Sequence, residues 1–306
     1  FKPVDDLHAP TTNRHSATDD LLNPAELLNP ESKRSASEAV VLATINQTTE
    51  AVVLDRDGNA FVSHDGSISR VTPDGQVELW TMTGTPRGHV ILSDGTHAIC
   101  DGRSRAVVQL SARGEAIGTL ATRSDGDFLR APHDLTLDAA GGIYFTDPGY
   151  ARLRNPIGNV HYVAPNGAVN VVAQKLAFPE GIAVSGNGQT LFVIESQTHS
   201  VLAFSILSGG RVGPKRVFFE LPKSANEDSF ANGLTIDSRG RLFVAGGRSG
   251  LVHAIDSNGK LLKSIETGLS EVTSVRFADT ASSTLFVTGS AANQSGVLAQ
   301  LNVNGI

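Results

Sequence analysis

The stretch APHDLTLDAAGGIYFTDPGY (residues 131–150) contains two short runs of alternating apolar residues separated by a Gly-Gly turn. Two strands of this length joined by such a turn form a β-hairpin. The same pattern is found in five other places, as EAVVLDRDGNAFVSH, GHVILSDGTHAIC, EGIAVSGNGQTLFVIE, NGLTIDSRGRLFVA and TSVRFADTASSTLFVTG. The chain is therefore built from a repeated hairpin unit.

Further strands follow most of these hairpins. A third strand is predicted in segments such as SISRVTPDG and AVVQLSARG, and a fourth in segments such as VELWTM and VNVVAQ. We name the residue before each first strand the entry residue of its unit; the six are Glu50, Gly88, His133, Glu180, Asn232 and Thr273. The differences between their numbers are 38, 45, 47, 52 and 41, the repeat length of propeller blades. The sequence predicts an all-β fold, a six-bladed β-propeller of four-stranded antiparallel blades.

The propeller is expected to occupy residues 37–306 as a single domain. Residues 1–36 are polar and punctuated by proline, which predicts an irregular N-terminal extension. The segment EAVVLATI (38–45) precedes the first hairpin, and we expect it to complete the sixth blade and so remove an exposed sheet edge. The single cysteine, Cys100, excludes an internal disulfide.

Charge and composition restrict the partners. The net charge of −6 and the absence of a basic run argue against nucleic acid and anionic membrane surfaces, and no apolar run is long enough to span a bilayer. We expect a small-molecule substrate and a monomer or weak oligomer. The sequence starts at Phe1, and sequons lie at Asn46 and Asn293. These features favour a secreted protein or one of the secretory-pathway lumen, with a cytoplasmic location as the alternative.

Propeller geometry gives the entry residues a common location. The innermost strands of the blades surround a central channel, so the six entry residues should converge at one mouth of it. Glu50, Asp134 and Glu180 would then be close together, and like charges at that distance require a cation or protonation. Oxygen ligands of this kind suit Ca²⁺. His133 and His89 could supply acid–base chemistry near neutral pH.

Three segments carry a family resemblance: PHDLTLDAAGGIYFTDPG, PEGIAVSGNGQTLFVIES and NGLTIDSRGRLFVA. From about residue 38 to residue 306 the chain resembles the senescence-marker-protein/gluconolactonase superfamily. That superfamily includes lactonases, the squid-type phosphofluoridase and paraoxonases, with strictosidine synthase as a distant relative. The resemblance implies a six-bladed propeller with Ca²⁺ on its axis. The typical ligands are a Glu before blade one, Asn before blades three and four, and Asp before blade five.

The residues of this chain match that ligand pattern only in part. Glu50 matches, whereas His133, Glu180 and Asn232 replace the Asn, Asn and Asp of blades three, four and five. By this resemblance the metal ligands would be Glu50, Glu180 and Asn232. Imidazole is a poor Ca²⁺ ligand, so a histidine at the blade-three position suggests catalysis or a reshaped pocket.

The resulting site assignment has two further parts. The catalytic candidates are His133, Asp134 and Glu180, with His133 as a base that activates water. The substrate-binding candidates are His89, Tyr150, Arg152, Asn232 and Thr273; Tyr150 and Arg152 lie on a loop of the kind that often covers a propeller mouth. A structural ion, or a hydrogen-bonded plug of the channel, would explain the same entry residues without catalysis.

Three functions remain open from the sequence. The first is a Ca²⁺-dependent hydrolase of a lactone or ester, in which the metal polarises the carbonyl group. The second is a metal-independent cyclase or condensing enzyme of secondary metabolism, similar to strictosidine synthase or a hetero-Diels–Alder catalyst, which acts by orientation and hydrogen bonding. The third is a non-catalytic binding propeller.

Overall fold

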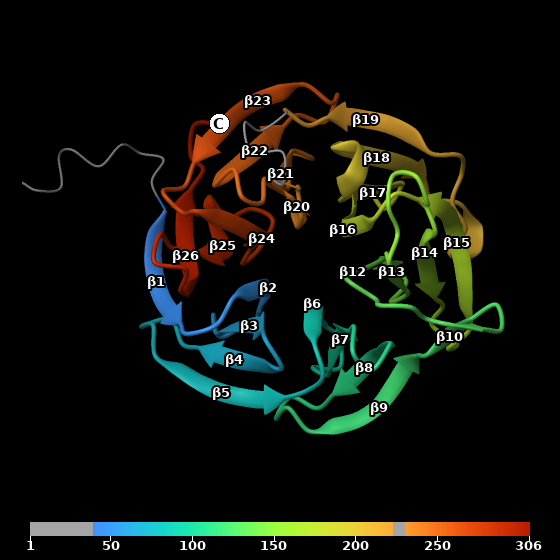
Figure 1. Cartoon of the computed structure of the whole chain (residues 1–306), viewed down its shortest axis with the longest axis horizontal. Coiled ribbons are helices and arrows are strands. Elements are labelled where there is room, and N and C mark those ends of the chain that lie inside the picture. Colours follow the sequence, from blue (N-terminus) through green and yellow to red (C-terminus); the bar gives the residue numbers. More distant parts are fainter. Residues whose placement is uncertain (1–38, 223–229) are drawn as a thin grey trace, which may run out of the picture. The chain divides into compact units, whose positions relative to one another are not determined.

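The described residues form a ring of six sheets (Figure 1). The structure is a computed structural model, and it describes residues 39–222 and 230–306. All described residues belong to one compact unit, Ala36–Ile306. Each of the six sheets has four antiparallel strands, so the predicted six-bladed β-propeller is confirmed. The predicted extension over residues 1–36 lies outside the described residues.

The blades follow one another along the chain. Blade one contains β2 (Thr49–Leu54), β3 (Ala60–His64), β4 (Ser67–Val71) and β5 (Val77–Met82). Blade two contains β6 (Pro86–Ile91), β7 (His97–Asp101), β8 (Ala106–Leu110) and β9 (Ala116–Ala121). Blade three contains β12 (Leu135–Leu137), β13 (Ile143–Asp147), β14 (Gly158–Val163) and β15 (Val169–Leu176), preceded by a small hairpin of β10 (Arg123–Ser124) and β11 (Asp127–Phe128).

The second half of the ring repeats this order. Blade four contains β16 (Pro179–Val184), β17 (Thr190–Glu195), β18 (Ser200–Ser205) and β19 (Arg216–Glu220). Blade five contains β20 (Leu234–Ile236), β21 (Leu242–Ala245), β22 (Leu251–Ile255) and β23 (Leu261–Glu266). Blade six contains β24 (Glu271–Phe277), β25 (Thr284–Ser290), β26 (Gly296–Asn302) and β1 (Val40–Ile45). No helix among the described residues is both long and apolar enough to cross a membrane.

The first hairpin of blade three shows how the sequence sets a blade. Leu135 pairs with Phe145 and Leu137 with Ile143, as the alternation in residues 131–150 predicts. In the turn, one side-chain oxygen of Asp138 accepts hydrogen bonds from the backbone N–H groups of Ala140 and Gly142. Gly141 has a φ of 85°, which glycine adopts at no steric cost. Local turn chemistry therefore fixes the register of the strands.

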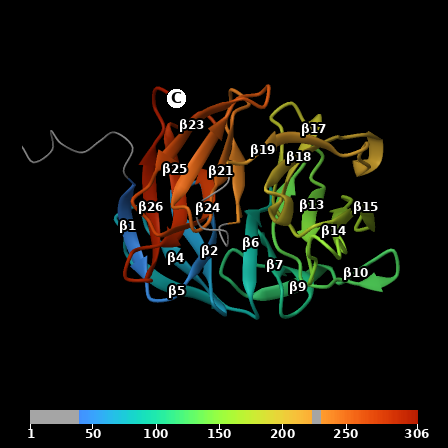
Figure 2. The same cartoon turned by 45° about the horizontal axis from the view of Figure 1, so that its top comes forward.

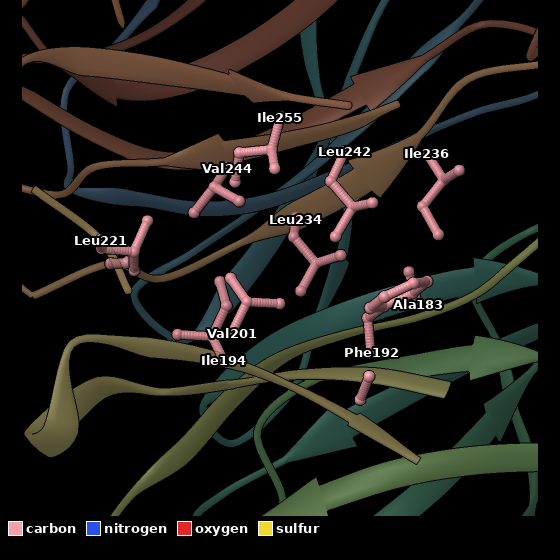
Figure 3. Close-up of a cluster of buried hydrophobic side chains, with 12 residues drawn as sticks. Ala183, Phe192, Ile194, Val201, Leu221, Leu234, Ile236, Leu242, Val244 and Ile255 are labelled. Carbon is pink, nitrogen blue, oxygen red and sulfur yellow. The ribbon is translucent and has the colours of Figure 1, made fainter. Parts of the chain in front are cut away.

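The hydrophobic core lies between neighbouring blades, because each sheet is covered on both faces. Figure 3 shows the cluster between blades four and five, where Ile194 and Val201 face Leu234 and Val244. Comparable clusters lie between the other neighbouring blades. At about 25 cal/mol for each Å² of apolar surface removed from water, these clusters supply the main stabilisation of the ring.

Blade six closes the ring with strands from both ends of the domain. Strand β1 pairs with β26, from Val40 opposite Gln300 to Ile45 opposite Gly296, which confirms the predicted closing strand. The six inner strands β2, β6, β12, β16, β20 and β24 surround the axis (Figure 1). In the tilted view of Figure 2, β24, β2 and β6 again lie next to one another.

Candidate functional site

A narrow pocket lies on the axis of the ring, where the inner strands begin. We call it the axial pocket; its lining residues are Glu50, Ala51, Arg87, Gly88, His133, Asp134, Asn232, Gly233, Thr273 and Ser274. Its cavity volume is about 10 Å³, roughly the space of one water-sized sphere. The structure thus brings together five of the six entry residues here, and the sixth, Glu180, contacts His133.

Close approach of neighbouring inner strands creates this convergence. The backbone N–H of Gly88 donates to His133 O at 2.7 Å, and that of Gly181 donates to Asn232 O at 2.8 Å. A Cβ atom at Gly181 would lie 2.4 Å from Asn232 O, so the position requires glycine. The glycines after or at the entry positions therefore hold the polar side chains of adjacent blades together.

His133 and Glu180 form a close pair that is largely shielded from solvent. His133 Nε2 lies 3.5 Å from Glu180 Oε1, and the Ser196 hydroxyl donates to Glu180 Oε2. Burial raises the pKa of Glu180 to about 8, opposed by the Ser196 hydrogen bond. Burial also lowers the pKa of His133 to about 3. The pair therefore carries one proton at neutral pH, and His133 Nδ1 has no hydrogen-bond partner among the described residues.

Asp134 lies beside this pair and within the electrostatic reach of Arg276. Its carboxylate accepts hydrogen bonds from the backbone N–H groups of Leu135 at 2.9 Å and Ile182 at 3.1 Å. Burial raises the pKa of Asp134 to about 6, while the positive charge of Arg276 opposes the rise. Arg276 is on β24, and its Nη2 donates to His89 O at 3.5 Å. Asp134 and Arg276 thus bring opposite charges into the interior of the ring.

A second arginine, Arg87, occupies the axial pocket itself. Arg87 Nη1 lies 2.6 Å from Glu50 Oε1, and both side chains are partly buried. Burial raises the pKa of Glu50, and the Arg87 charge acts against that rise. The sequence reasoning missed both arginines. The signal for Arg87 was available, since it immediately precedes the entry residue Gly88.

A wider cavity adjoins the axial pocket. We call it the outer cavity; its volume is about 370 Å³ and its lining residues are Glu180, Phe230, Asn232, Arg248 and Glu271. Asn232 lines both spaces, so a molecule in the outer cavity would lie next to the axial pocket. Arg248 Nε is 3.9 Å from Glu271 Oε1 and its side chain is 59% exposed, which leaves the guanidinium free to contact a ligand.

Three predicted substrate-binding residues lie outside both spaces. His89 is buried between blades one and two, where its Nε2 lies 2.8 Å from His97 Nδ1 and its ring contacts Phe61 and Trp80. This placement follows from strand alternation, which turns His89 away from the axis. Tyr150 is 81% exposed. Arg152 donates to Ala151 O, in the loop after β13.

Comparison with known proteins agrees with the architecture. The family model described as SMP-30/Gluconolactonase/LRE-like region matches residues 48–291. The chain belongs to this family. The match spans all or part of every blade and includes every residue that lines the axial pocket and the outer cavity.

Individual members of the family are distant from this chain. A gluconolactonase of Zymomonas mobilis is 23% identical over an alignment of 238 residues, and the match covers 67% of this chain and 66% of that protein, just under two thirds of its length. Regucalcin of Gallus gallus is 25% identical over 250 residues, covering 78% of this chain and 82% of that protein. A solved structure of a calcium-binding protein, regucalcin from Agrobacterium tumefaciens, superposes with a TM-score of 0.74 at 19% identity, covering 87% and 93% of the two chains.

The axial residues of this chain do not suit the calcium ion that the family resemblance implies. The carboxylate of Glu50, the one residue that matches the expected ligand pattern, is already paired with a guanidinium. Among the described residues, no three His, Cys, Asp or Glu side chains are grouped so that they could hold a metal ion. Calcium prefers six to eight oxygen ligands, whereas here the Arg87 guanidinium pairs with Glu50 and the Arg276 charge acts on Asp134.

Proposed function

We propose that this protein is an enzyme that hydrolyses a lactone or a related small ester at the axial pocket. The observation that carries the proposal is the buried His133–Glu180 pair beside the Arg87 guanidinium. The distant relationship to a protein named gluconolactonase supports a lactone as the substrate class. The outer cavity, about 370 Å³, has the size of a small organic substrate.

The substrate would lie in the outer cavity with its carbonyl group directed toward the axis. Negative charge develops on the carbonyl oxygen when water attacks the carbonyl carbon. The guanidinium of Arg87, which shares the axial pocket with His133, would donate hydrogen bonds to that oxygen. Asn232 lines both spaces and would orient the substrate between them.

The His133–Glu180 pair would handle the protons. The neutral imidazole of His133 accepts a proton from the attacking water, whose oxygen forms the new bond to carbon. Protonated Glu180 donates its proton to the ring oxygen as the carbon–oxygen bond breaks, so one water is consumed and a hydroxy acid leaves. A proton transfer from His133 to Glu180 across their 3.5 Å separation then restores the pair.

Substitution of Glu180 tests this role. Glu180→Gln keeps the shape of the side chain but removes the exchangeable carboxyl proton, so kcat for lactone hydrolysis should fall about 10²–10⁴-fold. A pH-indicator assay with a panel of five- and six-membered lactones, corrected for spontaneous hydrolysis, measures the loss. Glu195→Gln is the matched control, because Glu195 is equally buried at the end of β17 but accepts its hydrogen bonds from Ala177 and Thr198 outside both spaces. Equal activity of Glu180→Gln and wild type would contradict the proposal.

A metal-independent cyclisation is the second candidate. It is favoured by the two arginines at the axis, because hydrogen-bond donors and fixed charges can orient a flexible substrate without a metal. The two reactions differ in their use of water. Hydrolysis in H₂¹⁸O places one ¹⁸O atom in the product carboxyl group, whereas cyclisation places none.

A further inference from the structure

The position of Arg87 sets it apart from the other charged groups of the ring. It belongs to β6, directly before the entry glycine of blade two, and its Nη1 contacts Glu50 Oε1 across the blade boundary. The contact is 2.6 Å long, and the two side chains are 32% and 22% exposed. A short, partly buried pair of this kind is stronger than an exposed surface pair. The Glu50 carboxylate on the axis is therefore already paired with a cation, the Arg87 guanidinium.

Two arginines balance the charges of two carboxylates near the axis without a metal ion. Glu50 and Asp134 contribute two negative charges, and Arg87 and Arg276 contribute two positive charges. A divalent cation would add two more positive charges to a site with limited access to solvent. It would also have to displace Arg87 from Glu50, which leaves a partly buried guanidinium without its partner.

We propose that the Arg87 guanidinium is the resident cation of the axial pocket, in the place where the family resemblance implies Ca²⁺. The wild-type chain then takes no divalent cation there, and removal of the guanidinium frees Glu50, with Glu180 and Asn232 nearby, to bind one. The catalytic part of this inference, in which Arg87 polarises the substrate carbonyl, rests on the proposed function. The binding part does not.

A calcium titration tests the binding part directly. Isothermal titration calorimetry with CaCl₂ should show no stoichiometric binding to the wild-type full chain up to about 1 mM, the weak end of protein calcium sites. Arg87→Met, which keeps the length of the side chain without its charge, should bind one Ca²⁺ at least about tenfold more tightly than wild type, because a unit charge within a few Å is removed. The double variant Arg87→Met, Glu50→Gln should lose that binding.

Two controls accompany the calcium titration, a charge-conserving variant and a test of folding. Arg87→Lys retains the positive charge and should bind no more Ca²⁺ than wild type, and thermal unfolding of each variant shows whether it is folded. Stoichiometric binding of Ca²⁺ by the wild type at about micromolar concentration would overturn the proposal. Binding by Arg87→Met no tighter than by wild type would overturn it as well. If Arg87→Met does not fold, the wild-type and Arg87→Lys titrations still test the proposal, because stoichiometric Ca²⁺ binding by either protein would contradict it.

The catalytic role of Arg87 is tested separately, by measuring lactone hydrolysis. Lactone hydrolysis by the wild type should be unchanged by EDTA, and Arg87→Met should lower kcat more than it changes KM. If no lactone is hydrolysed by any variant, the proposed function fails while the calcium titration still decides which cation occupies the pocket. If EDTA abolishes hydrolysis, the assignment of the catalytic charge to Arg87 is wrong.

Discussion

Glu180 is a residue whose surroundings change its chemistry. The ring buries its carboxyl group between Ser196 and His133, so the neutral form is favoured. In water a glutamate is ionised at neutral pH and cannot act as an acid. Placement at the centre of the ring therefore turns an ordinary carboxylate into a proton donor.

The raised pKa of Glu180 predicts how activity depends on pH. The pKa is about 8 in the folded protein, so the carboxyl group loses its proton as the pH rises through that value. If protonated Glu180 is the acid, kcat/KM should fall on the alkaline side with an apparent pKa of about 8. A pH–rate profile between pH 5 and 10 measures this. A profile that stays flat to pH 10 would exclude the role.

The same shift predicts an effect on stability. A carboxyl pKa that is higher in the folded than in the unfolded state gives stability that is complete below the unfolded pKa and is lost as the pH rises through the folded pKa. Glu180→Gln removes that loss. The melting temperature of the variant minus that of wild type should therefore increase by several degrees from pH 5 to pH 9. Melting curves of both proteins at pH 5 and pH 9 test this. The same difference in melting temperature between variant and wild type at both pH values would contradict it.

The sequence could locate some residues of the site but not others. The positions of Glu50, His133 and Asn232 follow from the repeat, since equivalent positions of the blades meet at the axis. Arg87 and Arg276 are one residue before and three after their entry residues, and only the three-dimensional structure shows that Arg87 pairs with Glu50 and that the Arg276 charge acts on Asp134. His89 was misplaced because strand alternation turns it into the interface between blades.

At the scale of the element, the start of each inner strand combines a structural and a functional role. Gly181 follows Glu180 directly, and its N–H bonds to Asn232 O of the next blade. The same short segment therefore supplies a polar side chain to the pocket and holds the neighbouring segment in place. The hairpin repeats predicted these strands well because the alternation and the turn residues are local signals.

Substitution of Gly181 separates the two roles. In Gly181→Ala the new Cβ would lie 2.4 Å from Asn232 O, so one of the two backbones must shift. We expect a loss of about 1–3 kcal/mol in the free energy of unfolding, together with a higher KM as Asn232 moves. Urea unfolding measures the loss. Gly186→Ala is the control, since no atom lies within 4 Å of its Cβ position, and a similar loss in the control would contradict the explanation.

At the scale of the whole molecule, stability depends on closing the ring. Ala43 and Ile45 of β1 pack with Leu298 and Val52 between blades six and one. The closing strand was predictable because an apolar segment precedes the first hairpin and the sixth blade lacks a strand without it. The charge pairing of the entry residues was not predictable, because it depends on contacts between different blades, such as Arg87 with Glu50 and His133 with Glu180.

A charge in the closing strand tests this dependence. Ala43→Asp would bury a carboxylate in an apolar interface, and the free energy of unfolding should fall by at least about 2 kcal/mol. Thr44→Asp places the same charge on the exposed side of the strand and should change it by less than about 0.5 kcal/mol. The midpoints of urea unfolding compare the two. Equal unfolding midpoints of Ala43→Asp and Thr44→Asp would show that the closing strand contributes little to the stability of the ring.

The pairing of β1 with β26 also has a consequence for synthesis on the ribosome. Strand β1 leaves the ribosome before the other strands of the ring, but it can pair only after β26 has emerged, because the two strands are more than 250 residues apart. Until then the nascent chain presents unpaired strand edges, which readily associate with other chains. Assembly of this ring is therefore completed only after β26 has left the ribosome, and a chain that stalls before β26 is the species most in need of a chaperone.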